Sequence, residues 1–201
     1  NCNTTSDDDG MQNLILETNL TQFYGLDACG ECPNGYESVL DNGVLTDYRS
    51  FLHGKKIHSI YRRGKFIILE LEIGFLLFHL RMTGHMEIEL PDKRDLKYIS
   101  FHLTFNDGSQ LYFKDIRKFG RIYKCQSLNW LKNVLGIEPL SEDLTPTWLY
   151  QQIKCRKRMI KPLLMDQQFI AGLGNIYVDE ALWQSKIHPK AISSKIGKIR
   201  C

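Results

Sequence analysis

Residues 169–189, FIAGLGNIYVDEALWQSKIHP, place two glycines and an asparagine between two stretches with helical periodicity. We expect Gly172 to end the first helix, because glycine takes the positive φ of a helix C-terminal cap at little steric cost. Gly174 would let the backbone turn again, and Asn175 is predicted to be the N-cap of the next helix. The free N–H groups of that helix start form a place where a phosphate could approach closely. The alternative is an ordinary helix hairpin whose glycines only permit packing.

The C-terminal third around this turn is predicted to be helical. Apolar residues recur three and four positions apart in TPTWLYQQI (145–153), RMIKPLLMDQQFI (158–170) and IYVDEALWQSKI (176–187), as they do along one face of a helix. Three residues typical of helix starts, Ser141, Thr145 and Pro146, stand before or within the first of these stretches.

The middle of the chain has the period of β-strands instead. Short β-like runs occupy residues 56–63, 65–72, 75–90, 98–105 and 110–115. In the fourth run Ile99, Phe101, Leu103 and Phe105 alternate with Ser100, His102 and Thr104, and the turn Asn106-Asp107-Gly108 closes a hairpin into the fifth run. Consecutive short strands without helices between them indicate an antiparallel sandwich or barrel. The predicted fold class is α+β, with a β-sandwich at 46–135, a helical domain at 136–201 and an unassigned acidic segment at 1–45.

Charge is unevenly distributed along the chain. Residues 1–50 hold nine acidic residues and one basic residue, Arg49, whereas residues 51–150 hold 15 basic and 11 acidic residues. Residues 151–201 hold ten basic residues and three acidic ones, a net charge of +7. A basic C-terminal third is typical of a surface for a polyanion such as nucleic acid, and equally of a plain solvated surface.

Six cysteines are too few and too scattered for a secreted disulfide framework, so a reducing interior is expected. Cys29 and Cys32 have the spacing of half a zinc site or a redox pair, but no second pair follows to complete four ligands. Unpaired loop thiols are the alternative. No run of 18 apolar residues offers a membrane span, and we expect no membrane partner.

Five segments in order resemble the formamidopyrimidine-DNA glycosylase and endonuclease VIII family of base-excision repair enzymes. They are RRGKFIILEL (62–71), FHLRMTGHM (78–86), KDIRKFGRI (114–122), GIEPLSEDL (136–144) and IKPLLMDQQFIAGLGNIYVDEALWQSKIHP (160–189). The resemblance covers roughly residues 46–190. It implies a β-sandwich followed by a helix-two-turn-helix domain, a monomer that acts on duplex DNA with damaged bases or abasic sites, and a location inside the cell with the DNA.

The resemblance also assigns roles to individual side chains. Met82 corresponds to the wedge that fills the gap left by a flipped nucleotide, and Arg117 with Phe119 to the pair that faces the orphaned partner base. The Arg117 and Phe119 pair favours oxidised purines as substrates. Lys65 corresponds to a hairpin lysine that assists catalysis beside the damaged nucleotide. Contacts to phosphates are implied for Arg156, Lys161 and Asn175. From the residues alone, Met82 could be a core filler, Arg117 a partner of Asp115, Phe119 a sandwich core residue and Lys65 a surface lysine.

Two features of the family are not found in this sequence. Family members begin with Pro-Glu-Leu-Pro-Glu, whose proline amine forms a Schiff base with the sugar, whereas this chain begins NCNTTSDDDG. Many also carry a four-cysteine zinc finger after the helical domain; we expect no cofactor in the present chain, and one zinc ion only if such a finger is missing from it. The expected function is therefore that of an incomplete glycosylase with abasic-site lyase activity. A catalytically inactive DNA-binding paralogue and a protein-interaction scaffold are the alternatives.

Overall fold

The structure is a computed structural model of the 201-residue chain and describes residues 16–17, 39–41, 45–88 and 98–198. The chain forms two compact units. The first comprises residues 1–62 and 66–127, and the second comprises residues 63–65 together with 128–201. The boundary thus lies earlier than the one expected after residue 135, and a short turn from the middle of the β region belongs to the helical unit. Cys29 and Cys32, with the possible metal or redox site assigned to them, lie outside the described residues.

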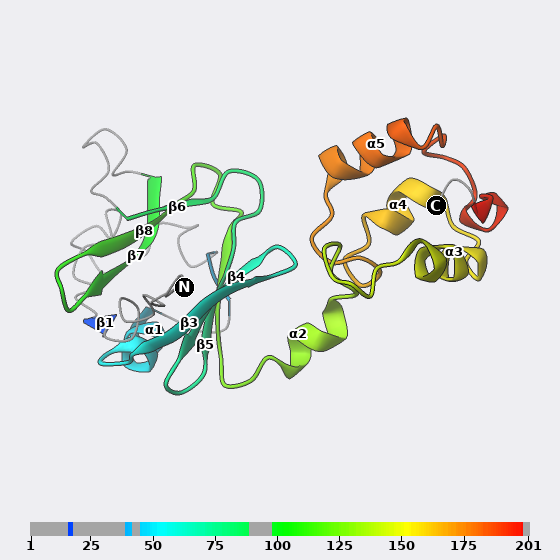
Figure 1. The fold of residues 1–201 in the computed structure, drawn as a ribbon. Coiled ribbons are helices and arrows are strands. Elements are labelled where there is room, and N and C mark those ends of the chain that lie inside the picture. Colours follow the sequence, from blue (N-terminus) through cyan, green and yellow to red (C-terminus); the bar gives the residue numbers. More distant parts are fainter. Residues whose placement is uncertain (1–15, 18–38, 42–44, 89–97, 199–201) are drawn as a thin grey trace, which may run out of the picture. The chain divides into compact units, whose positions relative to one another are not determined.

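The first unit holds two β-sheets (Figure 1). The strand orders are β2-β9-β5-β4-β3 and β1-β7-β8-β6. The pairs β4–β5, β5–β9, β6–β8, β7–β8 and β1–β7 are antiparallel, whereas β2 pairs with β9 in parallel. The strands are Leu16–Glu17 (β1), Leu40–Asp41 (β2), Ile57–Arg63 (β3), Phe66–Leu71 (β4), Phe75–His79 (β5), His85–Glu87 (β6), Ile99–Phe105 (β7), Gln110–Lys114 (β8) and Arg121–Cys125 (β9).

One hydrophobic core joins the two sheets. Phe78 of β5 packs against Phe101 of β7 and Phe113 of β8, with ring centroids 6.0 and 5.8 Å away. Helix α1, Leu45–Leu52, adds Tyr48, whose hydroxyl donates to the carbonyl of Ile122 at 2.7 Å. Burial raises the pKa of this hydroxyl well above its usual range. Because both sheets contribute to a single core, the first unit is a β-sandwich, and the predicted α+β class is confirmed.

The period-two pattern predicted the hairpin of this sandwich well. The odd-numbered residues of β7 are buried, and Gly108 takes the positive φ of +82° that closes the turn into β8. Ser100 breaks the alternation because the register shifts between Ile99 and Phe101, which leaves its hydroxyl buried. The long run at 75–90 was wrong as one strand, since it forms two, β5 and β6, separated by a turn.

The second unit is helical, as expected. Its helices are Asn129–Val134 (α2), Pro146–Lys154 (α3), Ile160–Leu164 (α4), Asn175–Gln184 (α5) and the short 3-10 helix Ser193–Lys195. The core of this unit is aliphatic, with Phe169 stacked on Trp148 at a centroid distance of 5.6 Å. Helix α3 begins as predicted, because the Thr145 hydroxyl accepts from the N–H of Trp148 and Pro146 occupies the first turn. Ser141 starts no helix; its hydroxyl donates to the carbonyl of Glu138 in a turn.

The helix predicted over 158–170 is much shorter in the structure, and this prediction was wrong. Helix α4 ends at Leu164, and Asp166 then forms local bonds that compete with helix continuation. Its carboxylate accepts from the N–H of Gln168 at 3.1 Å, and its carbonyl accepts from Phe169 and Ile170. The chain between α4 and α5 is therefore a braced turn and not the end of a long helix.

Candidate nucleic-acid interface

Three of the residues assigned from the sequence lie on two loops of the sandwich. Met82 is in the loop between β5 and β6, and Arg117 and Phe119 are in the loop between β8 and β9. The side chain of Met82 is 73% exposed and that of Phe119 is 51% exposed, so neither is a core residue. The structure brings the two loops together, because Arg117 Nη1 lies 3.9 Å from the sulfur of Met82.

A buried carboxylate holds these loops in place. Asp115 has no exposed surface, and its Oδ1 accepts from the Thr83 hydroxyl at 2.5 Å and from the N–H of Arg117 at 3.2 Å. Its Oδ2 accepts from the N–H of Gly120 at 2.7 Å. The contact between Arg117 and Asp115 is thus made by the backbone, which leaves the guanidinium at the surface. Sequence reasoning missed Asp115 as part of the site, although its place directly before the IRKFG loop was a signal.

The backbone of both loops is sterically constrained. A Cβ on Gly84 would lie 3.0 Å from the ring of Phe113 and 2.5 Å from the carbonyl of Leu80. A Cβ on Gly120 would lie 2.4 Å from the same ring. Arg81 and Lys118 take positive φ values of 57° and 54°, a conformation that side-chain-bearing residues adopt at a cost of about 1–2 kcal/mol. Neighbouring atoms of Phe113 and Leu80 therefore leave no room for a side chain at Gly84, and the Phe113 ring leaves none at Gly120.

Lys65 lies on the turn that belongs to the helical unit. Arg63 donates to Glu138 at 2.5 Å and to the carbonyl of Gly136 at 2.6 Å, while the N–H of Gly64 donates to Glu138. These bonds fix the turn of residues 63–65 on the GIEPL segment. The Lys65 side chain is exposed, and its Nζ lies 3.6 Å from the point that a Cβ on Gly174 would occupy. The structure thus places the candidate catalytic lysine beside the start of α5.

The turn before α5 differs from its prediction by one residue. Gly172 has the expected positive φ, +89°. The N-cap, however, is Gly174 with an extended backbone, and Asn175 is the first helical residue, so the prediction of Asn175 as N-cap was wrong. Glycine has no side chain, so no side-chain oxygen of the N-cap residue accepts a hydrogen bond from the N–H groups of the first turn. Asn175, Ile176 and Tyr177 in this turn are all exposed.

Gln167 braces this turn from within, a role that sequence reasoning missed. Its Oε1 accepts from the N–H of Gly172 at 2.9 Å, and its Nε2 donates to the carbonyls of Leu173 and Met165 at 2.8 and 2.9 Å. The backbone carbonyl of Gln167 also accepts from Gly136 at 2.8 Å. One amide side chain therefore fixes both ends of the turn.

The two predicted phosphate cations are partly engaged within the helical unit. Arg156 donates to the carbonyl and the side chain of Gln152 at 2.6 and 2.8 Å, and its guanidinium lies over the ring of Phe169. Lys161 on α4 pairs with both carboxylate oxygens of Asp179 on α5, at 2.7 and 2.9 Å. Both side chains retain partial exposure. A phosphate would therefore bind either cation in addition to these intramolecular contacts or in place of them.

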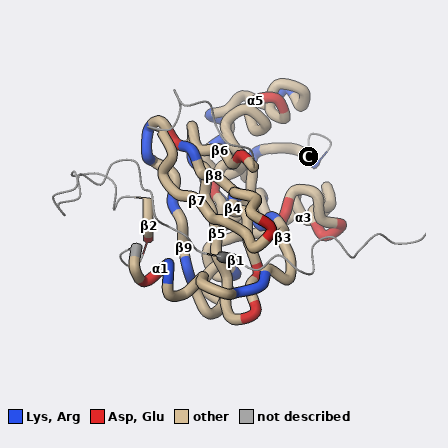
Figure 2. The backbone as a smooth tube through the Cα atoms, turned by 90° about the vertical axis from the view of Figure 1, so that its left-hand side faces the viewer, with Lys and Arg blue, Asp and Glu red and all other residues tan. Residues whose placement is uncertain are grey.

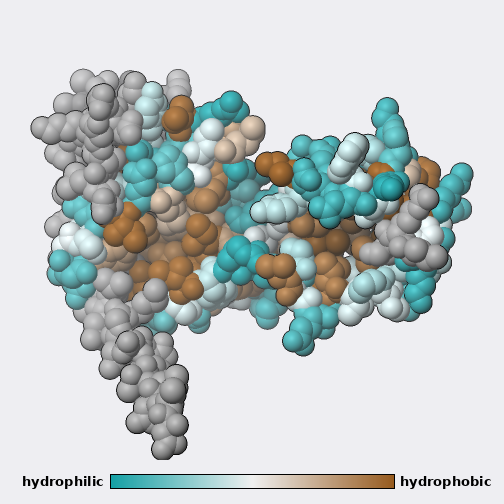
Figure 3. Space-filling view, turned by 45° about the horizontal axis from the view of Figure 1, so that its top comes forward, coloured by the Kyte–Doolittle hydropathy of each residue, from teal (hydrophilic) through white to brown (hydrophobic). Residues whose placement is uncertain are grey.

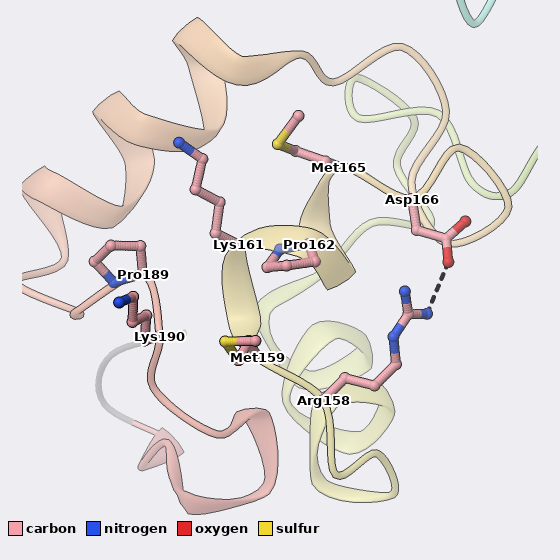
Figure 4. A pocket seen from close by; sticks show the side chains of 8 residues that line it. All are labelled: Arg158, Met159, Lys161, Pro162, Met165, Asp166, Pro189 and Lys190. Carbon is pink, nitrogen blue, oxygen red and sulfur yellow. Dashed lines mark hydrogen bonds and ion pairs between the residues drawn. The ribbon is translucent and has the colours of Figure 1, made fainter.

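A hollow of about 670 Å³ lies beside Lys161 (Figure 4). Met159, Pro162, Met165 and Pro189 give it an apolar lining, and Arg158, Lys161 and Lys190 place cations around it. Arg158 is paired with Asp166 at 2.8 Å, which holds the pKa of that carboxyl below its usual range. The cations at this hollow are suited to a polyanion, whereas its lining is suited to apolar groups.

Charge and hydrophobic surface occur in both units. Lys and Arg positions are spread over the sandwich as well as the helical unit (Figure 2). Hydrophobic residues reach the surface of both units (Figure 3). The large apolar or aromatic side chains that are exposed include Met82 and Phe119 in the first unit and Ile176, Tyr177 and Trp183 in the second. Over residues 45–88 and 98–198 and the short pieces before them, no three His, Cys, Asp or Glu side chains are grouped as a metal site would need. No helix in the described part of the chain is long and apolar enough to cross a membrane.

Comparison with known proteins relates both units to one group of enzymes. Residues 36–122 match the formamidopyrimidine-DNA glycosylase N-terminal domain, and residues 135–201 match the formamidopyrimidine-DNA glycosylase H2TH domain. The formamidopyrimidine-DNA glycosylase of Chloroflexus aggregans is 42% identical over 146 residues, which are 71% of this chain and 53% of that protein. That of Protochlamydia amoebophila is 42% identical over 147 residues, 73% of this chain and 53% of that protein.

A solved structure agrees with these matches. The Lactococcus lactis formamidopyrimidine-DNA glycosylase, non-covalently bound to DNA that contains an abasic site, superposes with a TM-score of 0.69 at 35% identity. The superposition covers 77% of this chain and 60% of that one. The chain thus spans about half the length of the two relatives named above.

Proposed function

Because the chain belongs to the formamidopyrimidine-DNA glycosylase family, we propose that it is a base-excision-repair enzyme that removes oxidised bases from duplex DNA and cleaves at abasic sites. Oxidised purines are the proposed substrates, and the proposed partner is damaged duplex DNA inside the cell, bound by one copy of the chain. The observation that carries the proposal is the contact of Arg117 with Met82 on two fixed loops, with Phe119 exposed on the same loop.

This set of side chains matches what base removal requires of a protein. A base inside a duplex is out of reach, so the nucleotide must be turned out of the stack, at a cost of roughly a few kcal/mol. An exposed thioether can fill the gap, a guanidinium can hydrogen-bond the edge of the orphaned base, and an aromatic ring can stack on it. Met82, Arg117 and Phe119 supply one group of each kind.

The helical unit supplies the complementary function of holding the strand. The first turn of α5 presents exposed residues at a glycine N-cap, where the partial positive charge of a helix start favours an anion. We assign phosphate contacts to Asn175, Lys161 and Arg156. Lys65, beside Gly174, is the proposed catalytic side chain, since a phosphate bound at the turn would bring the adjoining nucleotide to its amine.

Borohydride trapping on a duplex with one abasic site tests the proposal. The protein is compared with a chimaera whose residues 1–45 are replaced by the Pro-Glu N-terminal segment of a family member, because that segment provides the amine that forms the Schiff base. We expect the chimaera to form a borohydride-trapped complex and to nick the strand, and Lys65→Ala in the chimaera to slow both. A chimaera that binds the duplex but traps nothing would overturn the enzymatic proposal.

The second candidate is recognition of damaged DNA without base removal. It is favoured by the contact of Arg117 with the exposed Met82, since these side chains and Phe119 could recognise a gap in the duplex whether or not a base is removed. Preferential binding of the abasic duplex by an untrappable chimaera would support this function.

A further inference from the structure

We propose that Asp115 is a positioning residue that couples the loop of Met82 to the loop of Arg117 and Phe119. Because Asp115 also bonds to Thr83, insertion of Met82 into the gap in the duplex is coupled to recognition of the opposite base by Arg117. This inference rests on the proposed function and adds to it a determinant of opposite-base specificity.

The hydrogen bonds of Asp115 reach both loops. Oδ1 accepts from the hydroxyl of Thr83, the residue directly after Met82, at 2.5 Å. The same oxygen accepts from the N–H of Arg117, and Oδ2 accepts from Gly120, so the carboxylate spans the loop that carries Arg117 and Phe119. A fully buried carboxylate must keep its hydrogen bonds, because each bond lost leaves charge uncompensated in an apolar surrounding. A displacement of the loop that carries Arg117 would therefore also displace Thr83.

Packing joins the loops a second time. Gly84 and Gly120 approach the ring of Phe113 so closely that a side chain on either would collide with it. Neither loop can shift toward this ring, and Arg81 and Lys118 already take left-handed conformations. Among these links, the Thr83–Asp115 bond is the one that a single isosteric substitution removes without changing the glycines or the ring.

Coupling has a measurable consequence for DNA recognition. Met82 and Arg117 are in contact, so their substitutions are expected to affect binding non-additively. If Asp115 maintains that contact, the non-additivity depends on the hydroxyl of Thr83. If the loops act separately, the hydroxyl of Thr83 contributes to stability alone.

The experiment is a double-mutant cycle of Met82→Ala and Arg117→Ala, measured by fluorescence anisotropy on duplexes with a tetrahydrofuran abasic analogue opposite C, A, G or T. The cycle is run in three backgrounds: wild type, Thr83→Val, which removes the hydroxyl at constant shape, and Thr83→Ser, the matched control that keeps it. Thr83→Ala replaces Thr83→Val if the latter is not folded by circular dichroism.

In the wild-type and Thr83→Ser backgrounds we expect the Kd of the double variant to depart from the product of the single effects by about fivefold, within the range found for contacting residues. In Thr83→Val the departure should fall below twofold, and the preference among the four opposite bases should flatten. Equal coupling and equal base preference in all three backgrounds would overturn the inference while the proposed function stands. A wild-type protein without preference for the abasic duplex over an undamaged one would instead overturn the proposed function, and the inference with it.

Discussion

Two glycines of the sandwich loops, Gly84 and Gly120, lie where a side chain would collide with the ring of Phe113. Gly120 has an ordinary φ, so its requirement for glycine comes from the Phe113 ring and not from the backbone conformation. We expect Gly120→Ala to lower the free energy of unfolding by about 1–3 kcal/mol, the usual cost of inserting a methyl group into a packed site. Urea denaturation measures the change. Gly197→Ala is the control, since a Cβ there meets nothing within 4 Å, and an equal loss in both variants would contradict this account.

The assigned side chains themselves could not be found from local pattern. Met82 and Phe119 each follow or precede apolar strands, so periodicity favours the core for both, yet both are exposed. Only the resemblance of whole segments singled out Met82, Arg117 and Phe119. Gln167 escaped sequence reasoning, and Asp115 was considered only as a partner of Arg117, because a hydrogen-bonding side chain in a loop has no periodic signature and most of its partners depend on the fold.

The start of helix α3, in contrast, follows local chemistry that the sequence displays. Thr145 caps α3 as predicted, and we expect Thr145→Ala to destabilise the protein by about 1 kcal/mol because the N–H of Trp148 loses its acceptor. Thermal unfolding monitored by circular dichroism measures the effect. Thr147→Ala is the matched control on the same helix, because Thr147 is exposed and alanine is a better helix former. A drop in Tm for Thr147→Ala as large as that for Thr145→Ala would contradict the capping role.

The turn after α4 has a pH-dependent component. Arg158 lowers the pKa of Asp166, so the bond between them stabilises the fold fully at pH above the ordinary aspartate pKa and is lost as the pH falls through the lowered one. Asp166→Asn removes the charge but keeps an acceptor for Gln168. We expect wild type to be more stable than Asp166→Asn at pH 7, and the difference to shrink below about pH 4.

Chemical denaturation at pH 7 and pH 3 checks this expectation. In the Arg158→Gln background, the loss of stability caused by Asp166→Asn should be small at both pH values, because the guanidinium that favours the charged carboxylate is gone. A loss that persists at pH 3, or that survives the removal of Arg158, would show that another group is responsible.

Elements were predicted where periodicity ran long enough to decide their type. Strands β3, β4 and β8 came from short β-like runs bounded by turn residues, β7 from strict alternation, and helices α3 and α5 from apolar residues three and four positions apart. Helix α1 and strand β9 were missed, since LTDYRSFL and RIYKC are short and mixed in composition. The helix over 158–170 was overextended because apolar residues of a braced turn happen to continue the helical spacing.

At the scale of the whole molecule, DNA affinity should depend on salt. Each phosphate contact releases counterions, so the proposed contacts of Arg156 and Lys161 each add roughly one to the slope of log K against log salt. We expect Arg156→Gln and Lys161→Gln to weaken binding on damaged and undamaged duplexes alike, and to reduce that slope. Fluorescence anisotropy between about 50 and 200 mM salt measures it.

Lys132→Gln on α2 provides the control for general charge, because Lys132 is exposed and assigned no contact. If this variant lowers the slope as much as Lys161→Gln, the cations act through the overall charge and not through defined phosphates. Circular dichroism of each variant verifies that the Lys161–Asp179 pair can be lost without unfolding the helical unit.

The assignment of Arg63, Gly64 and Lys65 to the helical unit bears on how such a gene can recombine. A crossover placed after Ser127 would exchange residues 128–201 but leave these three residues behind, so Arg63 would have to pair with whatever residue the foreign unit places at the position of Glu138. Exchange of the complete unit takes one crossover after Ser127 and one pair of cuts around residues 63–65 in the β3–β4 hairpin. The two compact units therefore cannot be separated by a single cut in the sequence.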